Sequence, residues 1–291
     1  MHKYLRAIGF SSLSDKKKLK EILTDVVMTS TDRGFTKLEE HTNVAIMSKN
    51  ISPSLGISVC GEFDEEGHFI YDYYFPYLRS FVKSIQEEIT VERHSAQVSF
   101  AGVCEEINFG VIVIFYLQNF AGYFDAKNSG KLEKSYVSLT GLSTNGMILF
   151  PLAKNTIERK SEKLYAQKRK NLIQDARKGI ESAIESLTMQ DMGLYNTICK
   201  KIQESDVYSL VDSTFIPCGV ESDHYAVLGE ITHVSRETNM YTNEKIYILT
   251  ISCNDIMMEV AINENDLQGE PEVGRRFKGD IWLQGSVHVT E

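Results

Sequence analysis

The chain has 291 residues, of which 42% are hydrophobic and 24% charged, with a net charge of −9. This is the composition of an ordinary globular protein, and its longest apolar run, residues 111–117, falls far short of the ~20 residues that a membrane helix needs. The N-terminus lacks the sustained apolar core of a signal peptide. We therefore expect a cytoplasmic protein that makes no membrane contact.

The five cysteines are scattered and contain no C-x-x-C pair, which argues against a disulfide framework or a zinc site. Charge is distributed unevenly along the chain. Residues 205–291 hold 5 basic and 15 acidic residues, a net charge of −10 for that part alone. Such a surface repels phosphate backbones, so nucleic acid is not an expected partner.

Residues 1–154 predict an α+β domain with a mostly antiparallel sheet and two or three helices. We expect a first strand over Lys3–Phe10, then a helix that Ser14 and Asp15 cap. Two apolar runs, 44–47 and 56–60, predict strands, and the acidic turn 62–66 predicts a hairpin that returns through residues 68–75.

Further along, Pro76 is expected to end that strand, and the spacing of Leu78, Phe81, Val82 and Ile85 predicts a helix. Residues 97–103 and 109–118 predict strands, the second central and covered on both faces. A last pair of strands, 135–140 and 147–152, would flank a turn at 144–146.

Residues 155–204 predict a helical connector. Apolar residues recur at helical spacing from Ile157 to Leu187, interrupted by Gly179, and a second, shorter helix would follow residues 192–193. Residues 159–178 of the first helix are distinctly basic. A solvated face, or one that crosses the acidic C-terminal unit, is the favoured meaning, and a face that contacts a partner or RNA is the alternative.

Residues 205–291 predict a third unit, a small OB-like β-barrel. Four or five short strands alternate between apolar and polar residues, with glycines where a closed barrel must bend. The strands are expected over 227–231, 245–253, 256–263 and 281–289, with an edge strand at 213–217. On the last of them, period-2 geometry directs Trp282 outward, and we expect it to pack against the rest of the protein rather than against an external partner.

No catalytic or cofactor motif stands out, and no metal ligand set is complete. The turn with Glu62, Asp64, Glu66 and His68 lacks the spacing of a calcium loop. Residues 128–131 resemble the end of a phosphate loop but lack its upstream glycine and its final Ser or Thr.

The first ten residues, the charged mid-chain helix and the ending 273–285 resemble an uncharacterised family of clostridial-type Gram-positive bacteria. The resemblance spans nearly the whole chain. It implies a bacterial cytoplasmic protein without an assigned activity.

The first hypothesis for function is a non-catalytic interaction or scaffold protein that uses no cofactor and binds a protein partner or a second copy of itself. Its predicted interaction surface comprises Tyr247, Met257, Trp282, Arg169 and Lys170. The alternative is an enzyme or small-molecule binder with a pocket in the N-terminal domain, using groups such as His94, Glu105, Glu106 and Tyr116. A deep pocket that gathers several titratable groups would favour this alternative.

Overall fold

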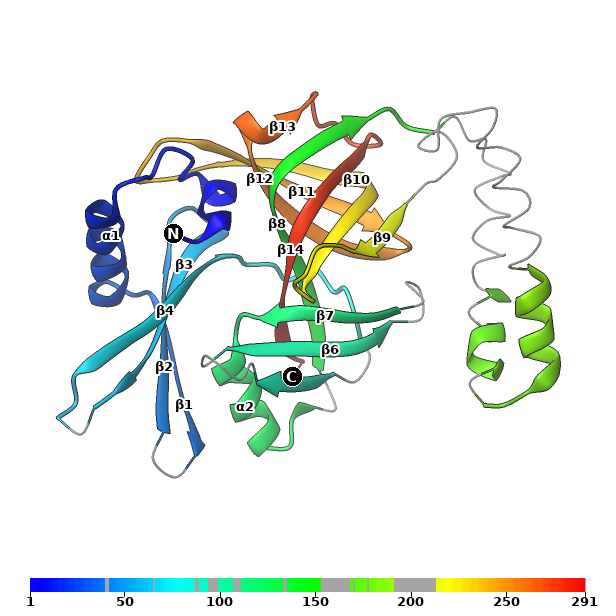
Figure 1. Ribbon diagram of the computed structural model, residues 1–291, viewed down its shortest axis with the longest axis horizontal. Coiled ribbons are helices and arrows are strands. Elements are labelled where there is room, and N and C mark those ends of the chain that lie inside the picture. Colours follow the sequence, from blue (N-terminus) through cyan, green and yellow to red (C-terminus); the bar gives the residue numbers. More distant parts are fainter. Residues whose placement is uncertain are drawn as a thin grey trace.

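The computed structural model is an α+β structure made mostly of antiparallel sheet, with few helices (Figure 1). Within the described part of the chain, no helix is long and apolar enough to cross a membrane. The structure describes residues 1–39, 42–64, 66–86, 89–93, 99–106, 111–132, 135–152, 168–169, 171–176, 178–190 and 213–290.

A four-stranded antiparallel sheet forms the first layer, in the order β1 (Asp32–Glu39), β2 (Thr42–Asn50), β3 (Leu55–Phe63) and β4 (Phe69–Leu78). Helix α1 (Lys16–Met28) lies against β2 and β3 and buries Leu19, Ile22 and Val26. The helix begins as predicted, because the Asp15 side chain accepts a hydrogen bond from the Lys17 amide at 2.8 Å.

The second layer is a ten-stranded sheet, and its strands come from both halves of the chain. One half supplies β5 (Thr90–Arg93), β6 (Phe100–Glu106), β7 (Val111–Leu117) and β8 (Ser135–Leu149). The other supplies β9 (Thr214–Pro217), β10 (His224–Thr238), β11 (Lys245–Cys253), β12 (Ile256–Asn263), β13 (Leu267–Gln268) and β14 (Arg276–Val289).

Strand β8 connects the two halves. It pairs in parallel with β12 and antiparallel with β14, so that hydrogen bonding runs from β8 through β12, β11, β10 and β14 back to β8. Strand β7 then adds to β14, and β6 and β5 follow it. The predicted boundaries at residues 154 and 205 divide the covalent chain, but strands from both sides of them pair within this one sheet.

Several predictions are confirmed by the strands themselves. The hairpin of β3 and β4 forms, β7 lies between β6 and β14, and β9 is an edge strand paired with β10. The predicted bounds of β11 and β12 match the structure. Each segment carries a local signal, such as the turn between β3 and β4, the unbroken apolar run of β7 or the alternation along β12, so local sequence is enough to specify it.

The expected first strand is wrong. Residues Lys3–Ile8 form a 3-10 helix, η1, which buries Tyr4, Leu5, Ala7 and Ile8. The element ends at Gly9, whose φ of 89° is a left-handed conformation that glycine adopts without strain. Four buried side chains in five positions fit a helical turn packed from several sides better than an alternating strand.

The expected helix near Leu78 is also wrong. Strand β4 continues through Pro76 to Leu78, and the chain then runs on without helix. The amides of Ser84 and Ile85 both donate to the carbonyl of Val137, so this segment crosses strand β8. Helical spacing was misleading here because Phe81 is exposed rather than part of a buried stripe.

The expected pair of strands over 135–152 is one strand, β8. Asn145-Gly146 is a common hairpin turn sequence, yet here it is extended. A Cβ atom at Gly146 would lie 2.5 Å from the Phe277 ring, so the glycine allows close packing instead of a turn. Local sequence also failed to indicate β1 and helix α2 (Phe120–Asn128).

Of the helical connector, residues 168–169, 171–176 and 181–190 are helical in the described part. Gly179 separates them with a φ of 82°, so the predicted first helix is interrupted there more sharply than expected. The start of the first helix and the second, shorter helix lie outside the described residues.

Candidate functional site

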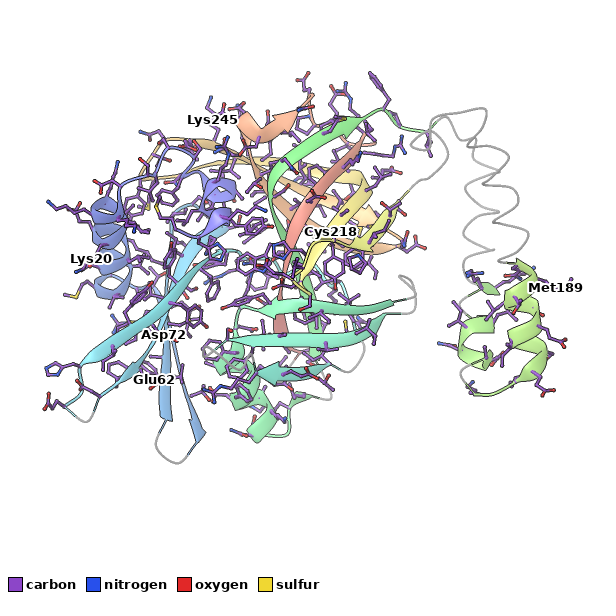
Figure 2. All side chains as sticks on the ribbon, viewed as in Figure 1. Lys20, Glu62, Asp72, Met189, Cys218 and Lys245 are labelled. Carbon is purple, nitrogen blue, oxygen red and sulfur yellow. The ribbon has the colours of Figure 1, made fainter. Side chains whose placement is uncertain are left out.

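A cleft of about 860 Å³ opens where η1, β7 and β14 meet the connection between β9 and β10. This connection, residues 218–223, begins at Cys218, which Figure 2 labels near the centre of the molecule. A second cavity of about 300 Å³ extends from it toward β4 and shares His2, Tyr116 and Trp282 with it. Both volumes are in the range of small-molecule pockets.

Trp282 forms the floor of the cleft. Its side chain is buried, and its ring lies 5.4 Å from the Tyr4 ring in a stacked arrangement. The rings of Tyr116 and His2 lie 5.1 Å and 4.8 Å from it. Trp282 therefore packs against the protein itself, as expected, and η1 and β7 are the elements that cover it.

One wall of the cleft carries hydrogen-bond acceptors. The Trp282 Nε1–H donates to Asp223 Oδ2 at 2.7 Å, and the Leu283 amide donates to the Asp223 carbonyl at 2.8 Å. These two bonds hold the residue 221–224 turn against β14. Asp223 Oδ1 and Glu221 Oε2 each lie 3.0 Å from Nδ1 of His224.

Glu221, Asp223 and His224 are also residue types that bind metals, with ligand atoms within 4.8 Å of one another. Their mutual contacts and the indole of Trp282 already account for this arrangement. We therefore treat the turn as the acceptor-rich wall of the cleft, with Glu221 the most exposed of the three side chains.

The nucleophilic groups near the cleft are held neutral. The Tyr116 hydroxyl donates to Tyr73 at 3.2 Å, and burial raises the pKa of both phenols well above their ordinary value. Burial also raises the pKa of the neighbouring Cys60 thiol to about 12. At neutral pH these three groups are therefore in their protonated, less nucleophilic form.

His2 sits in the cleft as a neutral imidazole. Its Nδ1 accepts a hydrogen bond from the Tyr4 amide at 3.3 Å, and its own amide donates to the Tyr74 hydroxyl at 2.8 Å. Burial and the nearby N-terminal charge lower the pKa of His2 to about 4, although Asp223 acts in the opposite direction.

This lowered pKa predicts acid sensitivity. In the unfolded chain His2 becomes protonated below about pH 6.5, whereas in the folded chain it becomes protonated only near pH 4. The free energy of unfolding should therefore fall across this window, with His2 contributing up to about 3 kcal/mol of the loss. Urea unfolding at pH 7.5 and pH 5 should show a smaller loss in His2→Asn, whose amide oxygen can still accept from Tyr4.

The control is His233→Asn, because the His233 side chain is exposed. This variant should keep the full pH dependence. Burial also lowers the pKa of His288, so His288 adds to the loss of stability at low pH. This contribution is the same in the original protein and in both variants. An unchanged pH dependence in His2→Asn would contradict the assignment of a buried neutral imidazole.

The structure separates most of the residues predicted from sequence. Of those that the structure describes, Trp282 and Tyr116 line the cleft. Tyr247 is half-buried under the Arg236 guanidinium, 5.3 Å from its ring, and the carbonyl of half-buried Met257 accepts from Ser84 at 2.6 Å. Arg169 is partly exposed in a described helical segment. Lys170 and His94 lie outside the described residues, as do the side chains of Glu105 and Glu106.

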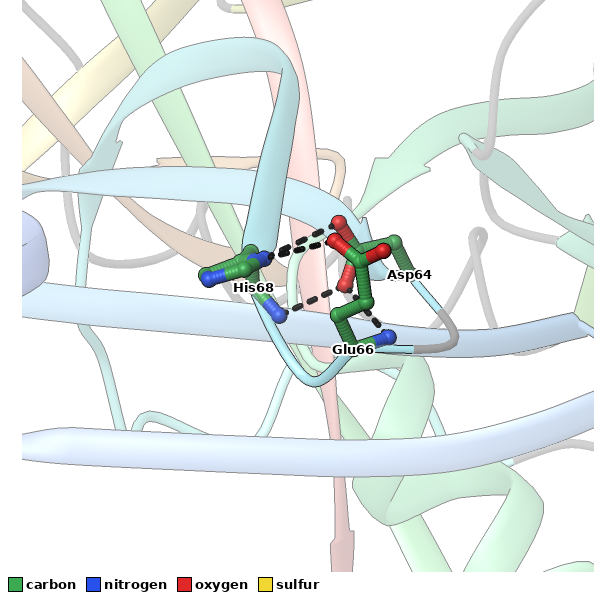
Figure 3. A group of neighbouring side chains, drawn as sticks. All are labelled: Asp64, Glu66 and His68. Atoms are coloured by element: carbon green, nitrogen blue, oxygen red, sulfur yellow. Dashed lines mark hydrogen bonds and ion pairs between the residues drawn. The ribbon is translucent and has the colours of Figure 1, made fainter.

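The acidic hairpin turn near His68 forms a compact cluster at the surface (Figure 3). Asp64 Oδ1 accepts from the amides of Glu66 and His68 at 3.0 and 2.7 Å, and His68 Nδ1 lies 3.3 Å from Asp64 Oδ2. These bonds close the turn between β3 and β4, so the cluster is explained by local structure.

Most residues of the cleft were not predicted from the sequence, among them His2, Tyr4, Glu221, Asp223 and His224. They carry no motif, because residues 2–4, 116, 223–224 and 282 meet only through packing. The one signal present is the group Glu221-Ser222-Asp223-His224, which holds three polar titratable side chains within four positions.

Comparison with known proteins gives one match. Residues 5–285 match a family model described as "Domain of unknown function, E. rectale Gene description (DUF3881)". No curated protein and no solved structure matches the chain. The resemblance to an uncharacterised clostridial-type family is thus confirmed over nearly the whole chain.

Proposed function

The chain belongs to this family of unknown function, DUF3881, and we propose, on the geometry of the cleft, that it is a non-catalytic small-molecule-binding protein. The observation that supports the proposal is the gathering of His2, Asp223 and His224 beside the Trp282 ring in a cleft of about 860 Å³. A cleft of this size, with apolar rings and a few fixed polar groups, is the usual form of a ligand site.

The lining favours a planar ligand that donates hydrogen bonds. Tyr4, Tyr116 and Trp282 form an aromatic edge, against which a flat ring can pack. Glu221 and Asp223 supply acceptor oxygens, and a ligand amine or amidine would satisfy them. The neutral phenols and thiol nearby support binding rather than covalent chemistry.

The ring of strands β8, β12, β11, β10 and β14 supports a finer fold assignment. Its strand connections are short on the β10–β12 side, and its cyclic pairing is what an OB-like barrel requires. We propose that this ring is such a barrel, completed by β8 from the other half of the chain, and that the protein acts in the cytoplasm.

A panel of planar amines, nucleobases and nucleosides tests the proposal by thermal shift and by fluorescence of Trp282, the single tryptophan. A ligand at 100 times its dissociation constant should stabilise the protein by about 2.7 kcal/mol. Binding in the cleft should also change the emission of Trp282.

The Asp223→Asn substitution should weaken the binding of a ligand found in this panel at least tenfold. Its matched control is Asp255→Asn in the β11–β12 turn, where Asp255 is exposed and where asparagine also tolerates the φ of 65°. A hit that binds both variants equally and leaves Trp282 emission unchanged would place the ligand elsewhere. A panel with no hit would favour the interaction or scaffold hypothesis.

A further inference from the structure

A third hollow lies between α1 and the four-stranded sheet, and none of the described residues that line it lines the wide cleft. It is a groove of about 480 Å³. Its walls are apolar, formed on one side by Leu23, Val27 and Met28 of α1 and on the other by Phe69, Tyr71 and Tyr74 of β4. Figure 2 shows α1, marked by Lys20, alongside the sheet.

The groove is not needed to hold α1 in place. The helix already buries Leu19, Ile22 and Val26, while Leu23 and Val27, one row further round, are only half-buried. Met28 at the end of the helix is 74% exposed, and Tyr71 across the groove is 48% exposed. Contiguous apolar surface that the fold leaves uncovered marks a place where another apolar group can bind.

A bulge in β4 builds the far wall. Gly61 pairs with Tyr71 and the adjacent Cys60 pairs with Tyr73, so Asp72 is an extra residue in the strand. The extra residue shifts the alternation by one position. Tyr71 and Tyr74 consequently both line the groove, whereas Tyr73 is directed toward Tyr116.

One end of the groove is positively charged. Lys16 and Lys20, one helical turn apart, line it at the start of α1, where the helix dipole adds further positive potential. None of the described residues that line the groove is acidic. Within the described residues neither lysine forms an ion pair, although Lys49 of the same sheet pairs with Asp25 at 2.6 Å.

The groove thus has a cationic end at Lys16 and Lys20 and an apolar end at Val27 and Met28. From Lys20 to Met28 the helix rises about 12 Å, at 1.5 Å per residue. We propose that this groove binds an aliphatic chain that ends in an anionic group, such as a medium-chain fatty acyl carboxylate. The chain packs between α1 and β4, and its carboxylate lies at the two lysines.

Isothermal titration with three probes that carry a twelve-carbon chain, each kept monomeric in solution, tests both ends of the groove. Dodecanoate should bind most tightly, dodecanol more weakly, and dodecyltrimethylammonium most weakly. Lys16→Gln combined with Lys20→Gln should weaken dodecanoate about tenfold and leave dodecanol unchanged.

The matched control is Lys17→Gln combined with Lys18→Gln. It removes the same charge from the same exposed turn, but neither residue lines the groove. For the apolar end, Met28→Glu should weaken both dodecanoate and dodecanol, whereas Met240→Glu, at another exposed methionine, should not. All four variants change exposed side chains, so folding is expected to be preserved.

If both double lysine variants lost the same affinity for dodecanoate, the effect would be one of general charge, and the proposal would be overturned. Binding of dodecyltrimethylammonium as tight as that of dodecanoate would also overturn it. Binding to anionic phosphatidylglycerol vesicles without binding to monomeric dodecanoate would also overturn it, since α1 would then be a membrane-surface helix. These outcomes do not depend on Asp223 or Trp282, so they leave the wide cleft to its own test.

Discussion

Cutting the backbone between Leu152 and Ser213 should leave the two pieces of the protein bound to each other in one folded particle. Strand β8 of the first piece pairs with β12 and β14 of the second along most of its length, and β7 pairs with β14 as well. A separated first piece would expose the edges of β8 and β7, and the second would expose β12 and β14.

Contacts outside the sheet add to this association. The buried Asn239 side chain donates to the carbonyl of Ile8 at 2.9 Å, and Glu237 accepts from the hydroxyls of Ser52 and Ser54 at 2.6 and 2.8 Å. The Tyr225 hydroxyl bonds both the amide and the carbonyl of Ile114. Each bond joins a residue before position 154 to one after position 205.

The measurement is gel filtration of the full-length protein after cleavage at a site-specific protease sequence inserted between Leu152 and Ser213. Both fragments should elute together at the volume of the intact protein and separate only in denaturant. An uncut sample with the same insertion is the control. Two separate, folded fragments in native buffer would instead support independent domains at 1–154 and 205–291.

Replacing Gln284 by leucine should lower the free energy of unfolding by about 2–4 kcal/mol, because it breaks a buried amide network. Gln284 is fully buried on β14. Its Nε2 donates to the carbonyl of Pro76 at 2.8 Å, and its Oε1 accepts from Gln118 Nε2 at 2.7 Å. Leucine has similar volume but leaves the Pro76 carbonyl without its donor.

Gln118 extends the same network. Its Nε2 also lies 3.1 Å from the Leu78 carbonyl, and its Oε1 accepts from Ser286 at 2.9 Å. The network therefore joins β4 of the first sheet to β7 and β14 of the second. Losing it should loosen the packing between the sheets as well as the strand itself.

Urea unfolding followed by circular dichroism measures the effect. The matched control is Gln268→Leu on β13, where the side chain is exposed, and its stability should stay within about 0.5 kcal/mol of the original. If Gln284→Leu were as stable as this control, the network would contribute nothing beyond the volume of its side chains.

The sequence by itself determined the α+β class and the elements whose signal is local. Helix α1 carries its own cap at Asp15, and the apolar residues of β11 and β12, which alternate in position along β12, were enough to predict the bounds of both strands. The same alternation placed Trp282 outside the strand ring, since Ile281 and Leu283 are fully buried. Capping and period-2 burial act over a few residues, so one segment is enough to show them.

Tertiary structure decided which neighbouring elements cover these strands and therefore which of their side chains are buried. Gln284 lies on the same side of β14 as Trp282, where local sequence predicts a solvated position, yet it is buried because β4 covers it. Asn145-Gly146 continues a strand instead of turning, since the Phe277 ring occupies the space over the glycine. Pairing energies between distant strands override such local preferences.

The candidate cleft is the clearest case of a feature that sequence could not show. Its floor comes from residue 282, its rings from residues 4 and 116, and its acceptor wall from residues 221–224. No spacing rule joins these positions, because β8 brings the two halves together only after folding. The groove beside α1 depends likewise on one extra residue, Asp72, whose bulge becomes visible only when β4 pairs with β3.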